Sequence, residues 1–389
     1  MKKTIRSYDL NNKRVIIRCD LNVSIKDGKI VDDSKIVASL NTIRYATSNN
    51  ARVILMSHLG KVKCEEDKDK NSLLVVANRL SELLEKDILF CPVTRGSELE
   101  EMVNSLKPRD VLLIENTRYE DYPNKLESGN DVELAKYWAS LGDIYINDAY
   151  GTAHRKHASN VGIAKFLPSG MGLLMELEVN KIDQIIKEDT HPFIVIMGGK
   201  KVEDKLKLIT KMLNICDKVL IGGAMAFTFL KAKGYNVGKS IVNDDEISRC
   251  KELLNNENLV LPVDVIVDNN GNISCKNIED IEDNDIGYDI GNLTIKLFND
   301  YISSSKRIVM NGPMGMFENN NFQNGTKEIY KTIIDNKIRC LVGGGDSLTS
   351  LKMLNIDSSK LIISTGGGAT LTYLEGGEMP GISVLNEEK

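Results

Sequence analysis

The sequence predicts an α/β protein with two doubly wound parallel-sheet (Rossmann-like) domains joined by a hinge helix. Three observations predict this fold class: short continuous apolar runs recur, helical patterns lie between them, and a turn-rich stretch at residues 167–172 separates two such series. Strands buried on both faces read as continuous apolar runs, and strands that alternate with helices form parallel sheets.

Ten apolar runs are the expected strands. Four lie in the first half, at residues 15–18, 53–56, 111–114 and 144–146. Six lie in the second half, at residues 193–197, 219–221, 259–267, 308–310, 340–342 and 361–363, and Pro262 breaks the third of them.

Helical patterns connect these runs. Apolar residues at helical spacing predict a helix over 202–213, with lysines on its other face. Acidic residues suit a helix N-terminus and favour a second helix over 244–254. The run from 173 to about 187 follows the turn-rich stretch, so we expect it to join the two domains.

Composition excludes several classes of protein. The chain has 389 residues, with 50 Lys+Arg against 55 Asp+Glu, and a net charge of −5 argues against a nucleic-acid binder. The longest apolar stretch, at residues 219–230, is too short to span a bilayer, and the first residues lack a signal-like apolar region. The seven cysteines form no C-x-x-C pair, which favours reduced thiols and a cytoplasmic protein.

Cationic and hydrogen-bonding residues follow the four strands of the first half. The segments are 20–22, 57–61, 115–118 and 147–155, and their cationic side chains are His58, Lys61, Arg118, His154 and Arg155. Ligands of open parallel sheets bind beyond the carboxyl ends of the strands, and such a cluster suits a phosphate or carboxylate. Each cation taken singly would instead be an ordinary surface residue.

Glycines follow the strands of the second half. Glycine accounts for 9 of the first 190 residues and 21 of the remaining 199. Repeated glycine turns that lead into helices predict a cradle for a nucleotide or polyphosphate, and Asp346 is placed to hold a metal on those phosphates. Tight turns without a ligand are the alternative for any single pair of glycines.

Neither a G-x-x-x-x-G-K-[ST] nor a G-x-G-x-x-G pattern occurs, which argues against a Walker-type NTPase and weakens a dehydrogenase interpretation. One domain for a small anion, a second for a nucleotide and a link that could close them together fit phosphoryl transfer.

Nine motifs then identify a family. They are RCDLN at 18–22, LMSHLG at 55–60, NDAYGTAHR at 147–155, GGKKVEDK at 198–205, GGAMAFTFLK at 222–231, LPVD at 261–264, NGPMGMFE at 311–318, GGGDS at 343–347 and STGGGA at 364–369. With these motifs in this order, the chain resembles the phosphoglycerate kinases along nearly its full length.

The resemblance implies a monomeric, cytoplasmic, ATP-binding kinase of glycolysis that bends at a hinge. It would pass the acyl phosphate of 1,3-bisphosphoglycerate to Mg-ADP, giving 3-phosphoglycerate and ATP, and the reverse. It implies Mg²⁺ with ATP/ADP, and no nucleic-acid or membrane partner. The expected domains are 1–172 for phosphoglycerate and 173–376 for the hinge helix and nucleotide, with 377–389 returning to the first domain.

The resemblance also assigns site residues. Substrate contacts would come from Asp20, Leu21, Asn22, Lys35, His58, Leu59, Gly60, Lys61, Arg118 and Arg155. Nucleotide contacts would come from Gly198, Gly199, Lys201, Lys205, Gly222, Gly223, Gly291, Asn311, Pro313, Met316, Glu318, Gly344, Gly345, Asp346 and Ser347. The implied catalytic residues are Lys35, Lys201, Gly345 and Gly368, and Asp346 would bind Mg²⁺ through the nucleotide.

The chain departs from the family pattern at five positions. Lys35 and Lys61 replace arginines, Ser24 replaces a proline, Lys200 an alanine, and Ser347 a threonine. Lysine keeps the charge but loses the planar fork that grips a phosphoryl group. Two interpretations stay open: an active kinase, and a catalytically weakened paralogue that binds nucleotide without efficient turnover.

Overall fold

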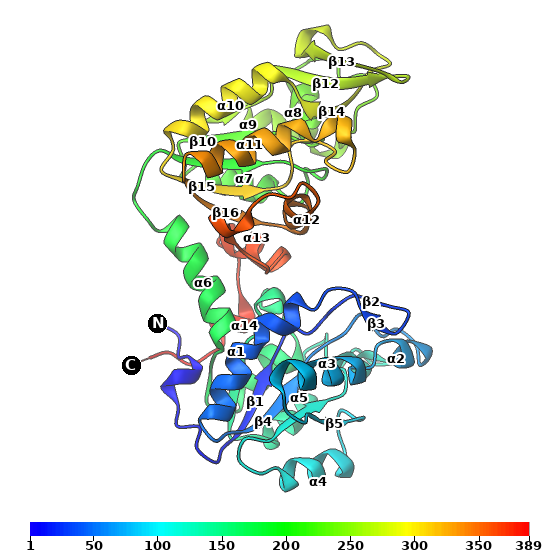
Figure 1. Cartoon of the computed structure of the whole chain (residues 1–389), viewed down its shortest axis with the longest axis vertical. Coiled ribbons are helices and arrows are strands. Elements are labelled where there is room, and N and C mark those ends of the chain that lie inside the picture. Colours follow the sequence, from blue (N-terminus) through cyan, green and yellow to red (C-terminus); the bar gives the residue numbers. More distant parts are fainter. Residues whose placement is uncertain (389) are drawn as a thin grey trace. The chain divides into compact units, whose positions relative to one another are not determined.

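The computed structural model describes residues 1–388, and each of its two units is built around a six-stranded parallel sheet (Figure 1). The first unit comprises Met1–Val179 with Glu378–Lys389, and the second comprises Asn180–Gly377. The predicted fold class is confirmed. Residue 389, the last of the predicted segment 377–389, lies outside the described residues.

The sheet of the first unit places four of the expected strands side by side. In spatial order its strands are β5 (Leu89–Cys91), β6 (Val111–Ile114), β4 (Arg52–Met56), β1 (Arg14–Arg18), β7 (Ile144–Asn147) and β8 (Ser169–Met171). Its helices are α1 (Ser34–Ser48), α2 (Glu66–Lys70), α3 (Leu74–Leu84), α4 (Ser97–Ser105), α5 (Val132–Ser140) and α14 (Pro380–Ser383), and a hairpin joins β2 (Ile25–Lys26) to β3 (Lys29–Ile30).

Burial explains why the apolar runs of this unit are continuous. Val15 and Ile17 of β1 pack into one core with side chains of α1 and α3, and Ile16, between them, is also fully buried. Because the side chains of a strand alternate between the two faces of the sheet, both faces are covered.

The sheet of the second unit has the order β11 (Leu259–Val260), β10 (Lys218–Ile221), β9 (Phe193–Met197), β15 (Arg307–Asn311), β16 (Arg339–Gly343) and β17 (Ile362–Ile363). Its helices are α7 (Leu206–Met212), α8 (Ala226–Ala232), α9 (Ile247–Leu253), α10 (Asn292–Ser304), α11 (Asn324–Asp335), α12 (Gly345–Met353) and α13 (Gly368–Leu374). The buried faces of α10 and α11 share a core with β9, β15 and β16.

A three-stranded antiparallel sheet departs from the sequence prediction. It consists of β12 (Asp264–Asn269), β13 (Asn272–Asn277) and β14 (Ile286–Ile290). The predicted single strand over 259–267 is therefore wrong. Pro262 has no N–H for a ladder, so the run divides between β11 of the large sheet and β12 of the small one.

Three helix or turn predictions also differ from the structure. The helix expected over 202–213 is α7, which begins only at Leu206, because residues 202–205 form turns. The helix expected over 244–254 begins with a 3₁₀ turn, Asp244–Glu246, and continues as α9. The turn-rich stretch 167–172 contains the edge strand β8, which pairs with β7.

Helix α6 (Leu173–Ile186) matches the predicted joining helix, and the division between the two units falls within it. Asp148, which follows β7, caps its start: Oδ1 accepts hydrogen bonds from the backbone N–H of Leu174 at 2.9 Å and of Met175 at 3.2 Å. Burial raises the pKa of the Asp148 carboxyl to about 6.

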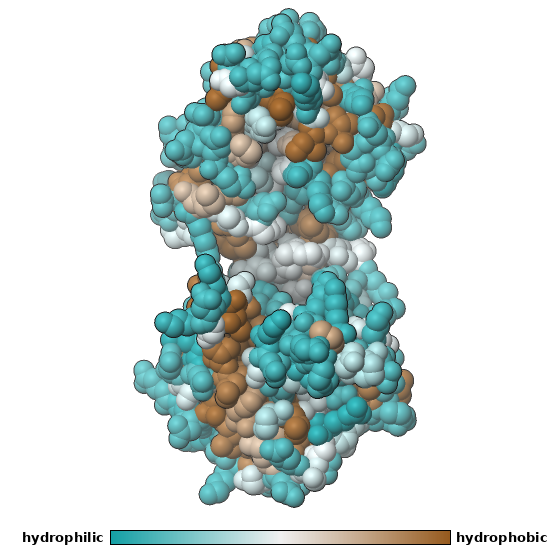
Figure 2. All heavy atoms as spheres, turned by 90° about the vertical axis from the view of Figure 1, so that its right-hand side faces the viewer, coloured by the Kyte–Doolittle hydropathy of each residue, from teal (hydrophilic) through white to brown (hydrophobic). Residues whose placement is uncertain are grey.

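The end of the chain belongs to the first unit. The N–H of Lys3 donates to the carbonyl of Asn386 at 2.8 Å, and that of Gly381 donates to the carbonyl of Ala153 at 2.8 Å. Hydrophilic side chains predominate on the face that Figure 2 shows, around smaller apolar areas. Among residues 1–388, no helix is both long and apolar enough to cross a bilayer.

Candidate active site

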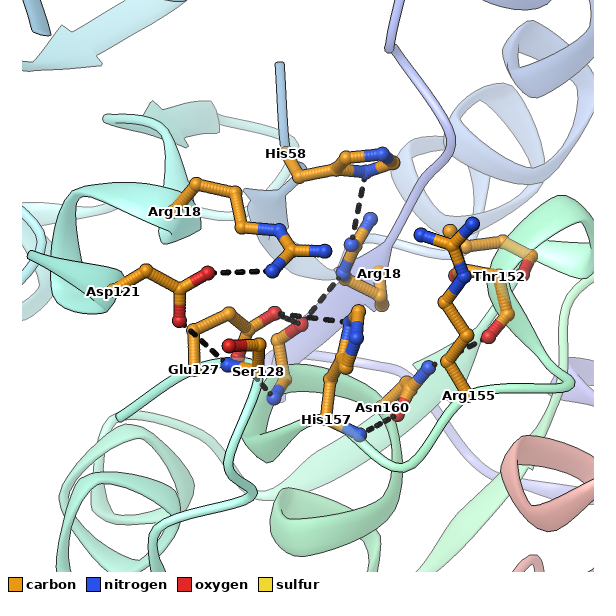
Figure 3. A network of polar contacts seen from close by, with 12 residues as sticks. Arg18, His58, Arg118, Asp121, Glu127, Ser128, Thr152, Arg155, His157 and Asn160 are labelled. Atoms are coloured by element: carbon orange, nitrogen blue, oxygen red, sulfur yellow. Dashed lines mark hydrogen bonds and ion pairs between the residues drawn. The ribbon is translucent and has the colours of Figure 1, made fainter. Parts of the chain in front are cut away.

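The cationic cluster of the first unit lies where the sequence predicts it, at the carboxyl ends of adjacent strands. Asp20 follows β1, His58 follows β4, Arg118 lies in the 3₁₀ helix Thr117–Asp121 after β6, and Arg155 follows β7. Because β6, β4, β1 and β7 are neighbours in the sheet, these side chains gather at one edge (Figure 3).

Arg118 is held in place by an acidic partner. Its guanidinium pairs with Asp121 at 2.5 Å, both side chains are only 9% exposed, and Nε of Arg118 is buried without a partner. Arg155 is exposed instead, and its Nε donates to Nε2 of His154 at 3.2 Å. The cluster therefore combines one fixed and one accessible guanidinium group.

Lys35 extends the cluster from α1. Its Nζ lies 3.0 Å from Oδ2 of Asp20, and the two side chains are 38% and 11% exposed. Lys61, the other lysine at a family arginine position, is exposed. The ammonium group of Lys35 thus reaches the segment that follows β1.

Hydrogen bonds fix the loops of this edge. Asn22 accepts from the N–H of Gly60 at 2.9 Å, and the N–H of Leu21 donates to Ser57 at 2.9 Å. Asn116 accepts from the N–H of Leu59 at 3.0 Å. A preformed loop loses little conformational entropy when a ligand binds.

Two histidines near this edge are uncharged at neutral pH. Burial, with the Arg18 and Arg118 guanidinium groups, holds the pKa of His58 well below its usual range. Burial and the same two arginines lower the pKa of His157 to about 3. His58 therefore offers a hydrogen bond to an anion, not a charge.

Sequence reasoning missed the residues behind this cluster. Arg18 and Glu127 are fully buried, and Ser159 lies between them, 2.8 Å from Nε of Arg18 and 2.5 Å from Oε1 of Glu127. An arginine that ends an otherwise apolar strand was the available signal for Arg18. Nothing in the loop around Glu127 marks it in the sequence.

The second unit contains a pocket of about 310 Å³ at the carboxyl ends of its strands. Its lining residues are Lys200, Lys201, Asp204, Lys205, Asn311, Gly312, Gly344, Gly345, Asp346, Ser347 and Leu371. The pocket brings together the lysine motif, the start of α12 and the end of β15, as the predicted phosphate cradle requires.

Lys205 braces two strand ends in this pocket. Its Nζ donates to the carbonyl of Gly198, after β9, and to that of Asn311 in β15. Burial lowers the pKa of Lys205 to about 8, although Asp346 and Asp204 act in the opposite direction. Lys201 is exposed at the pocket wall.

Backbone geometry opens the pocket to an anion at the start of α12. Gly344 has φ of 96°, a left-handed conformation that suits glycine, and a Cβ added at Gly345 would meet nothing within 4 Å. Ser347 accepts from the N–H of Gly312 at 2.7 Å and so ties α12 to the turn after β15. Gly368 starts α13 in the same way, after Gly367 at φ of 55°.

The glycine pairs pack against the turn after β15. The N–H of Gly199 donates to the carbonyl of Pro313 at 2.8 Å, and that of Gly223 to the carbonyl of Met314 at 2.9 Å. Cβ atoms added at Gly198 or Gly222 would collide with the same turn. These glycines permit close packing whether or not a base lies beside them.

Three predicted nucleotide residues lie outside this pocket. A Cβ on Gly291 would overlap the Asp264 carboxylate, and Met316 and Glu318 are exposed beyond the glycine pairs. Their predicted contacts with base and ribose are untested by the geometry of the phosphate pocket.

Metal binding depends on few protein ligands here. Residues 1–388 contain no group of three or more His, Cys, Asp and Glu side chains placed to hold a metal ion. Asp204 and Asp346 both line the pocket, and Mg²⁺ commonly takes one or two carboxylates together with phosphate oxygens and water. The residues present fit a magnesium ion that arrives with a nucleotide.

The comparisons with known proteins all point in one direction. The family described as Phosphoglycerate kinase matches residues 5–377. A phosphoglycerate kinase of Fusobacterium nucleatum is 48% identical over 398 residues, and one of Enterococcus faecalis is 48% identical over 395, with 100% of both chains covered in each case.

Solved structures agree with these relatives. A phosphoglycerate kinase from Coxiella burnetii has a TM-score of 0.89 and 35% identity, and the match covers 99% of this chain and 98% of the other. One from Pyrococcus horikoshii has a TM-score of 0.84 and 33% identity, with 98% of both chains covered.

Proposed function

Because the chain belongs to the phosphoglycerate kinase family, we propose that its two units divide the two substrates of that reaction between them. The enzyme reversibly transfers the acyl phosphate of 1,3-bisphosphoglycerate to ADP, giving 3-phosphoglycerate and ATP. In this proposal the unit of residues 1–179 and 378–388 binds the phosphoglycerate, and the unit of residues 180–377 binds the nucleotide.

The charges at the edge of the first sheet support the phosphoglycerate site. Arg118, Arg155 and neutral His58 would hold the phosphate that is not transferred, through charge-assisted and neutral hydrogen bonds. Asp20 and Asn22 would hold the hydroxyl and carboxyl end of the glycerate. This gathering of cations on four adjacent strand ends is the observation that carries the proposal.

The pocket at the start of α12 supports the nucleotide site. Gly344, Gly345 and Ser347 would face the phosphates with backbone N–H groups, and Lys201 and Lys205 would add positive charge. The glycines after β9 and β10 and residues Pro313, Met316 and Glu318 would take the base and ribose. Gly291 would contribute at the start of α10.

Phosphoryl transfer needs positioning and charge neutralisation more than covalent chemistry. Lys35 from the first unit, and Lys201 with the N–H groups of Gly345 and Gly368 from the second, would surround the transferred group. Asp346 would bind Mg²⁺ through the nucleotide, and the ion would neutralise charge on the phosphate oxygens.

We also propose a cytoplasmic monomer without nucleic-acid or membrane partners. The glycolytic reaction and the net charge of −5 support this setting. All seven cysteines are free in the structure, as a reducing compartment requires. The alternative of a catalytically weakened paralogue has no support in the comparisons.

Two measurements test the proposal. A coupled assay with 1,3-bisphosphoglycerate and ADP should show turnover, whereas ADP binding without turnover would contradict it. Hydrogen–deuterium exchange should then show protection of residues 18–22, 57–61 and 116–118 by 3-phosphoglycerate, and of 198–205 and 343–347 by Mg-ADP. Protection of the same segments by both ligands would overturn the division of substrates.

A further inference from the structure

Arg18 is a buried cation that the proposed reaction leaves without a role. It ends β1, has no exposed surface, and stands behind the phosphoglycerate edge (Figure 3). Each arm of its guanidinium group has a different partner. Nε donates to Ser159 at 2.8 Å, Nη1 donates to the carbonyl of Cys19, and Nη2 lies 3.2 Å from Nδ1 of His58.

The direction of these hydrogen bonds is forced by chemistry. A guanidinium group only donates, because it has no lone pair to accept with and keeps its proton in proteins. Nδ1 of His58 must therefore accept, so it carries no proton. The hydroxyl of Ser159 must likewise accept from Arg18, which leaves its own proton for Oε1 of Glu127 at 2.5 Å.

Glu127 completes the arrangement at the far end. Its Oε2 accepts from the backbone N–H of Ser159 at 2.9 Å, and the whole side chain is buried. Burial raises the pKa of this carboxyl, while Arg18, the two Ser159 hydrogen bonds and Arg118 act against that increase. The chain of donors therefore runs from Arg18 through Ser159 to Glu127 on one side and from Arg18 to His58 on the other.

The other nitrogen of His58 is left for a ligand. Nε2 has no hydrogen-bond partner within residues 1–388, although the side chain is only 6% exposed. Charged and titratable groups around the ring are Arg18 on β1, Lys35 on α1, Arg118 after β6 and His157 before the π-helical turn Ala158–Gly162. All of them disfavour a second proton on this ring.

From this geometry we propose that Arg18 is a positioning residue for substrate binding. It fixes His58 as the neutral tautomer with its proton on Nε2, and Ser159 and Glu127 hold Arg18 in place for that task. His58 then presents one N–H donor of fixed direction to the phosphate of the phosphoglycerate. The proposal rests on the substrate site proposed above, and its main test does not require activity.

The test is nitrogen NMR of the histidine side chains in the whole chain, with His58→Asn for assignment among four histidines. At pH 7 the wild-type spectrum should show His58 with an unprotonated Nδ1 and a protonated Nε2, and this pattern should persist at pH 5.5. A proton on Nδ1, or an imidazolium at pH 7, would overturn the proposal.

A substitution separates tautomer control from mere structural support. Arg18→Met removes the donor but leaves Glu127 as a buried charge, so the double variant Arg18→Met/Glu127→Gln is the one to compare. It should give a mixture of tautomers, a higher pKa for His58, and a KM for 3-phosphoglycerate raised about fivefold with kcat less affected. An unchanged tautomer in the folded double variant would refute the role of Arg18.

The matched control is Arg14→Met. Arg14 begins the same strand, and its guanidinium pairs with Asp143 at 3.2 Å at a partly exposed position. It should leave the His58 spectrum and the KM unchanged. If the tautomer shifts in the double variant and the KM does not, the substrate does not depend on this tautomer and the positioning role is wrong. A wild-type chain that fails to bind 3-phosphoglycerate would instead reject the proposed substrate site and leave the tautomer result standing.

Discussion

Replacing Lys35 by arginine should increase the rate of phosphoryl transfer. Lys35 is the second residue of α1, and its ammonium group lies 3.0 Å from Asp20. An ammonium group acts as a point charge, whereas a guanidinium fork can donate to Asp20 and to a phosphoryl oxygen at once. We expect Lys35→Arg to raise kcat about tenfold, the equivalent of about 1.4 kcal/mol in the barrier.

The structure limits what loss of the ion pair alone can do. The Lys35 side chain is 38% exposed, so its pair with Asp20 contributes at most about 1 kcal/mol to the ground state. A transition-state donor is typically worth about 10²–10³ in kcat. Lys35→Ala should therefore lower kcat by that larger factor while Mg-ATP still binds.

Single-turnover rates are the appropriate assay, because opening and product release can limit kcat in steady state. Lys26→Arg is the matched control, since Lys26 is an exposed lysine of the β2–β3 hairpin of the same unit. Equal single-turnover rates for the wild type, Lys35→Arg and Lys35→Ala would refute the reasoning, and the predicted catalytic role of Lys35 would then be wrong.

Three further predictions concern the other sites. Asp346→Ala should weaken Mg-nucleotide binding about tenfold or more and spare 3-phosphoglycerate, and equal losses for both ligands in calorimetry would contradict the two-site assignment. Arg155→Ala should raise the KM for 3-phosphoglycerate about 10- to 100-fold and leave that for ATP unchanged, and the reverse result in steady-state kinetics would place the substrate in the other unit. Asp148 ionises only when its raised pKa of about 6 is exceeded, so the stability of the first unit should fall as pH rises through that value. Asp148→Asn should remove that loss, and its stability relative to the wild type should improve by about 3 kcal/mol between pH 4 and pH 8 in urea unfolding followed by Trp138 fluorescence, whereas a pH-independent difference would contradict it.

The sequence predicts the strand ends of the site well because their positions follow from topology. Parallel strands place their carboxyl ends at one edge, so His58 and Arg118 needed only the correct strands to be brought together. The ion pair between Arg118 and Asp121 was not anticipated, although the two residues are close in sequence. Spacing alone does not distinguish a solvated cation from one held by a buried carboxylate.

The contacts of Arg18, Ser159 and Glu127 could not be predicted from the sequence. They join β1 to two loops far along the chain, and no periodic pattern marks a contact between distant loops. The small sheet of β12, β13 and β14 was missed for another reason. Its strand β13 is largely exposed and polar, so it lacks the apolar run by which the other strands were predicted.

The return of the last residues to the first unit has a consequence for synthesis on the ribosome. The hydrogen bonds from Lys3 to Asn386 and from Gly381 to Ala153 form only after the whole second unit has been translated. At about 5–20 residues per second, the first unit waits for these partners for on the order of tens of seconds. The nascent chain therefore completes its nucleotide-binding half before the half that it began first.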